Sequence, residues 1–136
     1  MKTTAHSTFS VEGWDEQSFT EGETALKLTR ANVAKTFHGD VEGTGTLWYL
    51  MFYGPEEQTR VVGLERVTGT LGGKSGSFVL EHDGSDNGSE ARTKLTILPQ
   101  SGTGELAGLR GSGEMLATRT GELTMQLEYE LGSASS

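Results

Sequence analysis

Apolar and polar residues alternate along most of this chain with a period of two, which predicts β-strands. The clearest case lies near the C-terminal end, where every second residue is apolar: Leu123, Met125, Leu127, Tyr129 and Leu131. The residues between them are polar or charged, so this strand has one face for a core and one for solvent. Similar alternation over 4–14 and 91–98 predicts two further strands, and the polar stretch 15–23 predicts a loop.

The segment 24–37 is compatible with a helix by residue propensity and with a long strand by its alternation. Leu26 and Leu28 alternate, whereas the apolar positions change phase by Val33 and Phe37. Such a change is typical of a strand that contains a β-bulge. We therefore predict a bulged strand here.

The segment 44–53 is apolar on both faces, as in a strand that is covered on both sides. In a single-sheet barrel, one of these faces must meet another element or a second copy of the chain. We therefore predict a homo-oligomer, a dimer or a trimer, with these interface candidates: Leu47, Trp48, Leu50 and Phe52. The alternative is a loop or a terminal segment folded over the strand.

The stretch 61–82 reads as a β-hairpin around the glycine-rich turn 72–75. Closing the hairpin on Gly73 and Lys74 sets Glu65 directly opposite His82. Both residues then end the apolar face of the hairpin. This carboxylate–imidazole pair is the strongest chemical lead in the chain.

Together these segments predict an all-β protein, a closed eight-stranded antiparallel meander barrel. A short helical turn is expected at 105–109, before extended structure resumes over 111–119. We predict a single barrel domain over 1–131 and a disordered tail over 132–136.

Composition narrows the class of function. The net charge is −8 without any basic cluster, so no nucleic-acid or membrane partner is expected. The chain has no cysteine, which excludes disulfides and thiolate metal sites. The N-terminal residues lack the apolar core of a signal peptide, and a cytoplasmic protein is expected.

Three motif-like stretches carry no function in our interpretation. The residues Gly73-Lys74-Ser75 lack the first glycine and the helix of a phosphate loop, so a hairpin turn explains them. The stretch 83–94 begins like a calcium loop but ends in Lys94 instead of glutamate. The three histidines lack metal-ligand spacing. We predict no metal and no cofactor.

The candidate site lies in the barrel lumen. Glu65 and His82 are the candidates for proton transfer or for anchoring a polar group of a ligand. The alternative is an ion pair that only plugs one end of the barrel or lies at its rim. The predicted ligand-binding set adds apolar lumen residues to this pair: Phe78, Leu80, Leu95 and Tyr129.

Several stretches form a recognisable set when taken in order: FSV at 9–11 with Trp14, FHGD at 37–40, GLERVTGTL at 63–71, GSFVL at 76–80 with His82, and SGTGELAGLRG at 101–111. They resemble a bacterial family of unknown function over nearly the whole chain, from about Thr4 to Leu131. That family is similar in fold to plant allene oxide cyclase, an eight-stranded barrel that forms trimers. The resemblance implies a closed barrel and self-association, and a lumen carboxylate role would fall on Glu65.

Three hypotheses of function follow. The first is a barrel that binds a small, mostly apolar ligand in its lumen, with Glu65 and His82 as polar anchors. The second is an isomerase or cyclase in which one of these two residues moves a proton while the apolar lumen excludes water. The third is a non-catalytic assembly module that associates through the strand at 44–53.

Overall fold

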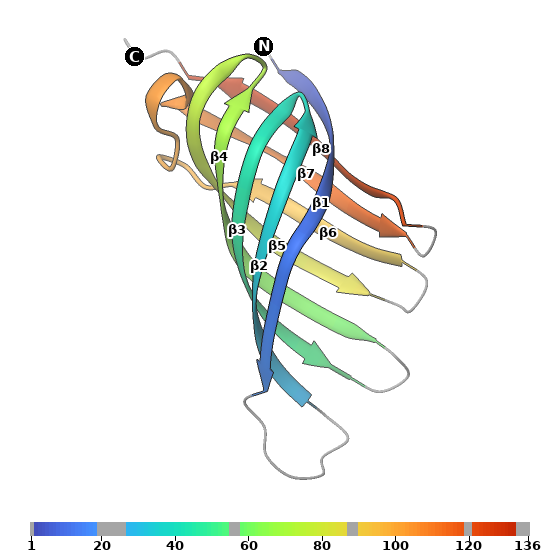
Figure 1. Cartoon of the computed structure of the whole chain (residues 1–136). Coiled ribbons are helices and arrows are strands. Elements are labelled where there is room, and N and C mark those ends of the chain that lie inside the picture. Colours follow the sequence, from blue (N-terminus) through green and yellow to red (C-terminus); the bar gives the residue numbers. More distant parts are fainter. Residues whose placement is uncertain (1, 19–26, 55–57, 87–89, 119–120, 133–136) are drawn as a thin grey trace.

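The computed structural model describes residues 2–18, 27–54, 58–86, 90–118 and 121–132, and these form one closed antiparallel barrel (Figure 1). The strands follow one another around the barrel in chain order, and the last pairs with the first. Their bounds are β1 (Thr3–Ser18), β2 (Lys27–Gly39), β3 (Val41–Tyr53), β4 (Thr59–Leu71), β5 (Lys74–Asp86), β6 (Glu90–Ile97), β7 (Leu109–Thr118) and β8 (Leu123–Leu131). The predicted eight-stranded meander barrel is confirmed.

Strand β2 is regular, and the bulge predicted within it lies in β1 instead. Every second residue of β2 from Thr29 to Phe37 is buried, without a change of phase. Leu28 therefore points outward and is 46% exposed. The register between β1 and β2 shifts between Val11 and Gly13. The apolar pattern of β2 had suggested the bulge only because Leu28 was taken as an inward residue.

Strand β1 continues beyond the bulge. Residues 15–18, predicted as part of a loop, continue the strand to Ser18. Beyond the bulge, Trp14 pairs with Val33 and Glu16 pairs with Ala31, both of which are inward-facing residues of β2. Because paired residues share a face of the sheet, Trp14 and Glu16 turn toward the lumen. The bulge thus adds an indole and a carboxylate to one end of the barrel.

Strand β3 is apolar on both faces, as predicted. Leu47 is fully buried in the lumen, so it cannot belong to an outer interface, contrary to the expectation from sequence. Trp48 and Leu50 face outward and are 59% and 54% exposed. Phe52 follows them on the same outer face at 37% exposure. The outer side of β3 is therefore a row of large apolar side chains.

The β4–β5 hairpin turns one residue earlier in the chain than the sequence suggested. It closes on Gly72 and Gly73, whose φ angles are +59° and +85°, so Leu71 pairs with Lys74. Glycine adopts both positive φ angles of such a two-residue turn without steric cost. The predicted register is therefore wrong by two residues, and Glu65 lies diagonally from His82. A slip of two residues keeps every side chain on its face, so both residues still point into the lumen.

One end of the barrel is plugged by the connection between β6 and β7. Strand β6 ends at Ile97, opposite Leu80, and the following residues take over the hydrogen bonding along the start of β5. Ser77 N–H donates to Thr103 Oγ1, and Thr103 N–H donates to the Ser77 carbonyl. The predicted helical turn is the 3₁₀ turn η2 (Gly104–Leu106), which inserts Leu106 into the core.

Strand β1 begins and strand β8 ends at the plugged end (Figure 1). Gly132, the first residue of the predicted tail, donates its N–H to the Gly108 carbonyl at 2.9 Å. Residues 133–136 lie outside the described part of the chain. Within the described ranges, no helix has the length and apolar character needed to cross a bilayer.

Candidate ligand-binding site

Four polar side chains meet in the middle of the lumen. Glu65 on β4 accepts a hydrogen bond from Nε2 of His82 on β5, with Oε1 and Nε2 2.9 Å apart. Nδ1 of the same ring lies 3.1 Å from the Tyr49 hydroxyl on β3. Lys35 on β2 brings its Nζ within 3.6 Å of Glu65 Oε1. Four neighbouring strands therefore supply one buried network.

The network determines the protonation of its histidine. A carboxylate only accepts hydrogen bonds, so Nε2 of His82 carries the proton and Nδ1 accepts the hydroxyl proton of Tyr49. Burial lowers the pKa of His82, an effect that the hydrogen bond to Glu65 opposes. Burial and then the charge of Glu65 raise the pKa of Tyr49. Both rings are therefore neutral near neutral pH.

Glycines on the inner face make room for these side chains. Gly63 lies between Tyr49 and His82 in the sheet, because it pairs with both. Since Gly63 has no side chain, the two rings meet edge to face with their centroids 5.4 Å apart. Gly45 similarly pairs with Lys35, and a Cβ there would overlap the carboxylate of Glu65.

Lys35 is held by weak contacts. Its Nζ lies 3.3 Å from Met115 Sδ and 4.6 Å from the centroid of the Phe9 ring. The 3.6 Å separation from Glu65 is an ion-pair distance and longer than a good hydrogen bond. Burial lowers the pKa of Lys35, and the charge of Glu65 partly opposes this shift. The second carboxylate oxygen, Glu65 Oε2, is buried without any partner among the described residues.

A cavity of about 340 Å³ lies directly beside this network. Lys35, Tyr49 and Thr93 form its floor, and the rest of the lining is mainly apolar. The wall and rim residues come from all eight strands: Phe9, Val11, Trp14, Val33, Met51, Tyr53, Thr59, Val61, Ser85, Asp86, Ala91, Met115, Ala117 and Leu123. The cavity occupies the end of the barrel opposite the plug, where β1, β3, β5 and β7 end.

The rim carries a small hydrogen-bonded group. Glu16 Oε2 accepts hydrogen bonds from the hydroxyls of Thr29 and Tyr53, and its other oxygen accepts one from the Trp14 indole N–H. Burial and the bond to Glu16 raise the pKa of Tyr53 to about 12. Burial works to raise the pKa of Glu16, but the three hydrogen bonds outweigh it and the net shift is downward. The rim therefore presents a carboxylate that stays ionised.

The site residues predicted from the sequence lie in two places: Glu65 and His82 lie behind the cavity floor, and the apolar residues lie away from the cavity. Glu65 and His82 meet as predicted, but they lie behind the cavity floor and do not line it. Phe78, Leu80 and Leu95 belong to the packed half of the lumen. Tyr129 lies near the plugged end, where its hydroxyl approaches the turn glycine Gly72.

Sequence reasoning missed Lys35 and Tyr49. The signal for Lys35 was its place at an inward position of a strand, between Val33 and Phe37. Tyr49 lies in a strand that is apolar on both faces, and nothing in the sequence paired it with His82. Both residues are functional candidates because they belong to the buried network and also line the cavity.

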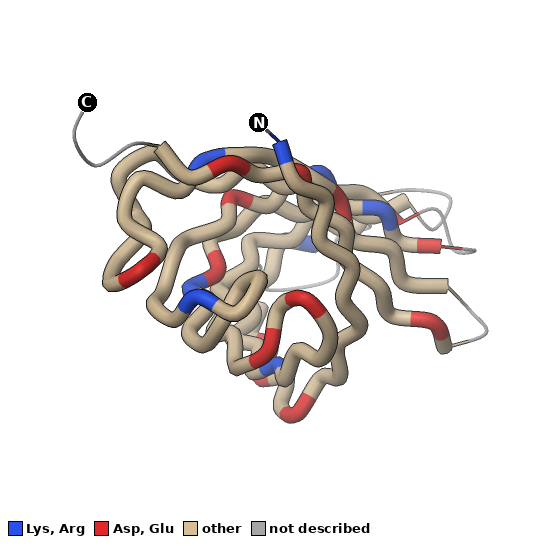
Figure 2. Tube along the Cα trace, turned by 90° about the horizontal axis from the view of Figure 1, so that it is seen from above, with Lys and Arg blue, Asp and Glu red and all other residues tan. Residues whose placement is uncertain are grey.

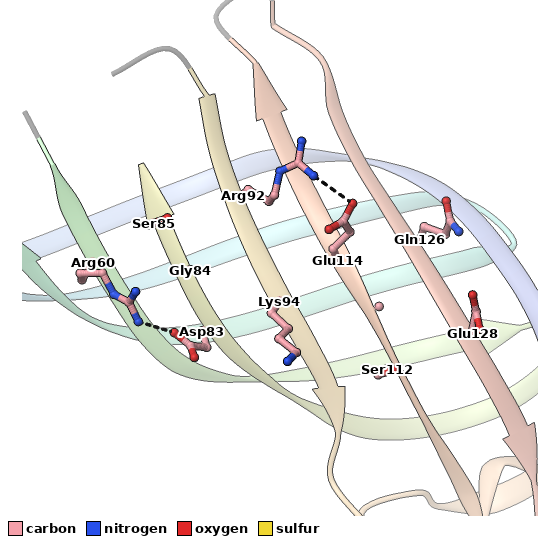
Figure 3. A pocket seen from close by; sticks show the side chains of 11 residues that line it. Arg60, Asp83, Gly84, Ser85, Arg92, Lys94, Ser112, Glu114, Gln126 and Glu128 are labelled. Carbon is pink, nitrogen blue, oxygen red and sulfur yellow. Dashed lines mark hydrogen bonds and ion pairs between the residues drawn. The ribbon is translucent and has the colours of Figure 1, made fainter. Parts of the chain in front are cut away.

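A second hollow, on the outside of the barrel, is a weaker candidate. It is a shallow trough over β4 to β8 in which charged side chains point to solvent (Figure 3). Arg60 pairs with Asp83 at 2.8 Å, and Arg92 approaches Glu114 at 3.6 Å. Such exposed pairs contribute little energy and leave little uncompensated charge. Within the described ranges, no group of three His, Cys, Asp or Glu side chains is arranged to hold a metal ion.

The chain is similar to known proteins of one family. The family model for a protein of unknown function, DUF3224, matches residues 5–129. The chain belongs to the DUF3224 family. A crystal structure of a protein with unknown function from this family, from Shewanella oneidensis MR-1, is 27% identical; the match covers 98% of this chain and 100% of that one, with a TM-score of 0.84. No curated protein matches.

The resemblance to a bacterial family of unknown function is thereby confirmed. The further likeness to allene oxide cyclase stays a prediction. The DUF3224 relative shares the fold over its full length and is itself a protein with unknown function. The chemistry of the site must therefore be argued from the side chains of this chain.

The first prediction concerns the space at Gly45. We expect Gly45→Ala to destabilise the protein by about 1–3 kcal/mol, because the added methyl group overpacks the network. It would lie 2.8 Å from Phe37 Cε2 and closer still to the Glu65 carboxylate. Chemical denaturation measures the loss. Gly13→Ala is the control, since its Cβ would meet only Ala34 Cβ at 3.8 Å. Equal stability of the two variants would contradict the tight fit.

The second prediction concerns pH. Because burial lowers the pKa of His82 from 6.5, the unfolded chain binds this proton more readily than the folded protein. The stability contribution is full above pH 6.5 and is lost as the pH falls toward the folded-state value. We expect His82→Gln to flatten the decline of unfolding free energy below pH 6.5. His38→Gln, at an exposed histidine, should retain the wild-type slope. The hypothesis fails if both variants keep that slope.

Proposed function

We propose that this DUF3224 protein binds a small, mostly apolar molecule in the cavity at the unplugged end of its barrel. The observation that carries the proposal is the cavity itself: about 340 Å³, with apolar walls and a floor of Lys35, Tyr49 and Thr93. Small-molecule sites are typically concave and apolar with a few convergent polar groups. This combination separates the cavity from the exposed polar trough.

Among the described residues, the lumen is packed at one end of the barrel and holds the cavity at the other. An eight-stranded barrel holds either its own side chains or one small ligand. Here Leu106 and Leu109 fill the plugged half together with Phe37 and Phe78. The other half contains smaller residues, such as Ala91 and Ala117, that line the cavity. A bound molecule would complete the packing of the lumen.

Glu65 and His82 support the floor in this proposal. Glu65 is fully buried, and its carboxylate is within reach of both His82 and Lys35. The groups that meet the ligand are then Lys35 and Tyr49, which both line the cavity. This geometry favours binding over an isomerase or cyclase in which Glu65 or His82 touches the reacting atoms. The cytoplasmic location expected from the sequence belongs to the same proposal.

The third prediction tests the cavity with 1-octanol, a neutral apolar probe with one polar end. We expect the folded protein to bind it in ligand-observed saturation-transfer NMR. Ala117→Trp should abolish the signal, because the indole fills the cavity. The matched control is Ser112→Trp, which adds the same indole to the outer trough. Binding that survives Ala117→Trp, or no binding by the wild-type protein, would rule out this site.

We propose self-association as a second function, through a surface that we name the outer apolar face. It comprises six outward side chains on three neighbouring strands: Leu28, Trp48, Leu50, Phe52, Val62 and Leu64. Leu50 pairs with Val62 in the centre, and Trp48 pairs with Leu64 beside them. A contiguous exposed apolar patch of this kind is typical of an interaction surface.

Charge at the two edges favours a second copy of the chain as the occupant. Along one row of the sheet, Arg30 pairs with Leu50, and Val62 pairs with Asp83. The apolar centre therefore has Arg30 at one edge and, at the other, the ion pair in which Asp83 holds Arg60 of the same chain at 2.8 Å. A two-fold axis parallel to the strands brings Arg30 of each copy opposite Asp83 of the other. Complementary edges of this kind fix the register of an interface.

The fourth prediction follows from this face. We expect Trp48→Glu to shift the protein toward the monomer in native mass spectrometry and sedimentation, because it places a charge in the apolar centre. Gln126→Glu adds the same charge on the outer face of β8, away from the patch, and should leave the oligomer intact. An oligomer that is unchanged by Trp48→Glu, or a wild-type monomer, would exclude assembly through this face.

A further inference from the structure

Lys35 is the feature of the cavity that binding alone leaves unexplained. It is the only buried lysine within the described ranges, at 4% exposure. A cavity needs no amine to hold an apolar molecule, and burying an ammonium group is costly. Lys35 nevertheless lies at the boundary between the buried network and the cavity lining. Its amine therefore serves as a counter-charge to Glu65 and also faces the cavity, where a ligand could reach it.

The charges around the cavity favour a neutral ligand. At the floor, the charge of Lys35 is balanced by Glu65, so the pair sums to zero. An anionic ligand would add an uncompensated charge to this buried site. At the rim, Asp86 lines the cavity and Glu16 bonds to the lining residues Trp14 and Tyr53, while the basic Lys27 has its Nζ 5.7 Å from the centroid of the Tyr53 ring. The chain as a whole carries a charge of −8, and acidic residues recur around the barrel (Figure 2). A carboxylate or phosphate compound is disfavoured by the balanced pair at the floor.

The contacts of Lys35 leave its amine available. Glu65 directs Oε1 to His82 at 2.9 Å and only reaches Lys35 at 3.6 Å. The nearest other polar contact of Nζ is the thioether of Met115, a weak acceptor. Among the described residues, no neutral oxygen accepts a hydrogen bond from Nζ. The amine is thus positioned by Glu65 and by aromatic rings, without being saturated with hydrogen bonds.

We propose that Lys35 forms a reversible imine with a small apolar aldehyde or ketone that occupies the cavity. The inference rests on the proposed ligand-binding function and names the class of its ligand. The step balances without a further reactant. The lone pair of the neutral amine attacks the carbonyl carbon and forms a C–N bond. The C–O bond then breaks, and the carbonyl oxygen leaves as water with both N–H hydrogens.

The surroundings of Lys35 favour this step in two ways. Burial lowers the pKa of Lys35, and each unit of such a shift raises the ratio of neutral amine to ammonium about tenfold. When the imine gains a proton, the resulting cation lies where the ammonium group was, beside the Glu65 carboxylate. The apolar walls, which include Val33 and Met51, surround the remainder of the ligand. Water has limited access to hydrolyse the bond in such an environment.

The fifth prediction tests the imine with octanal, whose chain matches that of 1-octanol. The native protein is incubated with octanal and sodium cyanoborohydride, and the alkylated lysines are then mapped by peptide mass spectrometry. We expect most of the label on Lys35, despite its burial, and much less on the exposed Lys74 and Lys94. Lys35→Met should lose the dominant adduct, and the matched Lys94→Met should retain it. Excess 1-octanol should compete with the labelling.

The outcomes separate the two proposals. If 1-octanol binds but octanal labels only exposed lysines, the imine is excluded and the binding function stands. If neither compound binds, the proposed function fails together with the imine. If octanal labels Lys35 in the wild-type protein and Ala117→Trp abolishes this labelling, both the binding proposal and the imine proposal are supported. The wild-type map decides the question even if Lys35→Met does not fold, because it assigns the adduct within the native protein.

Discussion

A carboxylate buried in the middle of the lumen is the constraint on which the rest of the site depends. Glu65 has no exposed surface, and a buried ionised group is tolerated only when it is paired and hydrogen-bonded. His82 and Lys35 supply that pairing from the two sides of β4. Removing one partner of such a pair typically costs about 3–5 kcal/mol, because the remaining charge stays buried. The network therefore constrains four strands at once.

The same network separates the lumen into a packed part and a part that contains the cavity. On one side, the connection between β6 and β7 folds over the start of β5 and inserts Leu106. On the other side, the lining residues leave about 340 Å³ unfilled. The polar network lies between the packed core and the cavity. Two of its members, Lys35 and Tyr49, line the cavity. A packed half gives the barrel its stability, and an unpacked half gives it room for a ligand.

The two surfaces of β3 illustrate how one strand can serve two purposes. Its inner row carries Leu47 and Tyr49 to the core and the cavity floor. Its outer row carries Trp48 and Leu50 to the outer apolar face. Because side chains alternate strictly along a strand, an interface on the outside does not compete with a site on the inside. Ligand binding and assembly are therefore compatible within the proposed functions of this DUF3224 protein.

The sequence by itself determined the closed meander of eight strands and the faces of most of them, because a period of two is a local property of the chain. It misassigned the face of Leu28 and residues 15–18 of β1. It also brought Glu65 and His82 together, since both lie on the inner face of one hairpin. Its register was wrong by two residues, but the faces survived because the side-chain period is also two.

Only the tertiary structure revealed Lys35 and Tyr49 as partners of that pair, because they arrive from other strands, and contacts across strands depend on registers that several turns set jointly. The position of the bulge, the plug over one end and the cavity at the other likewise depend on how all eight strands close. Closure decides which lumen positions are filled and which stay empty, and no local pattern of residues encodes that volume.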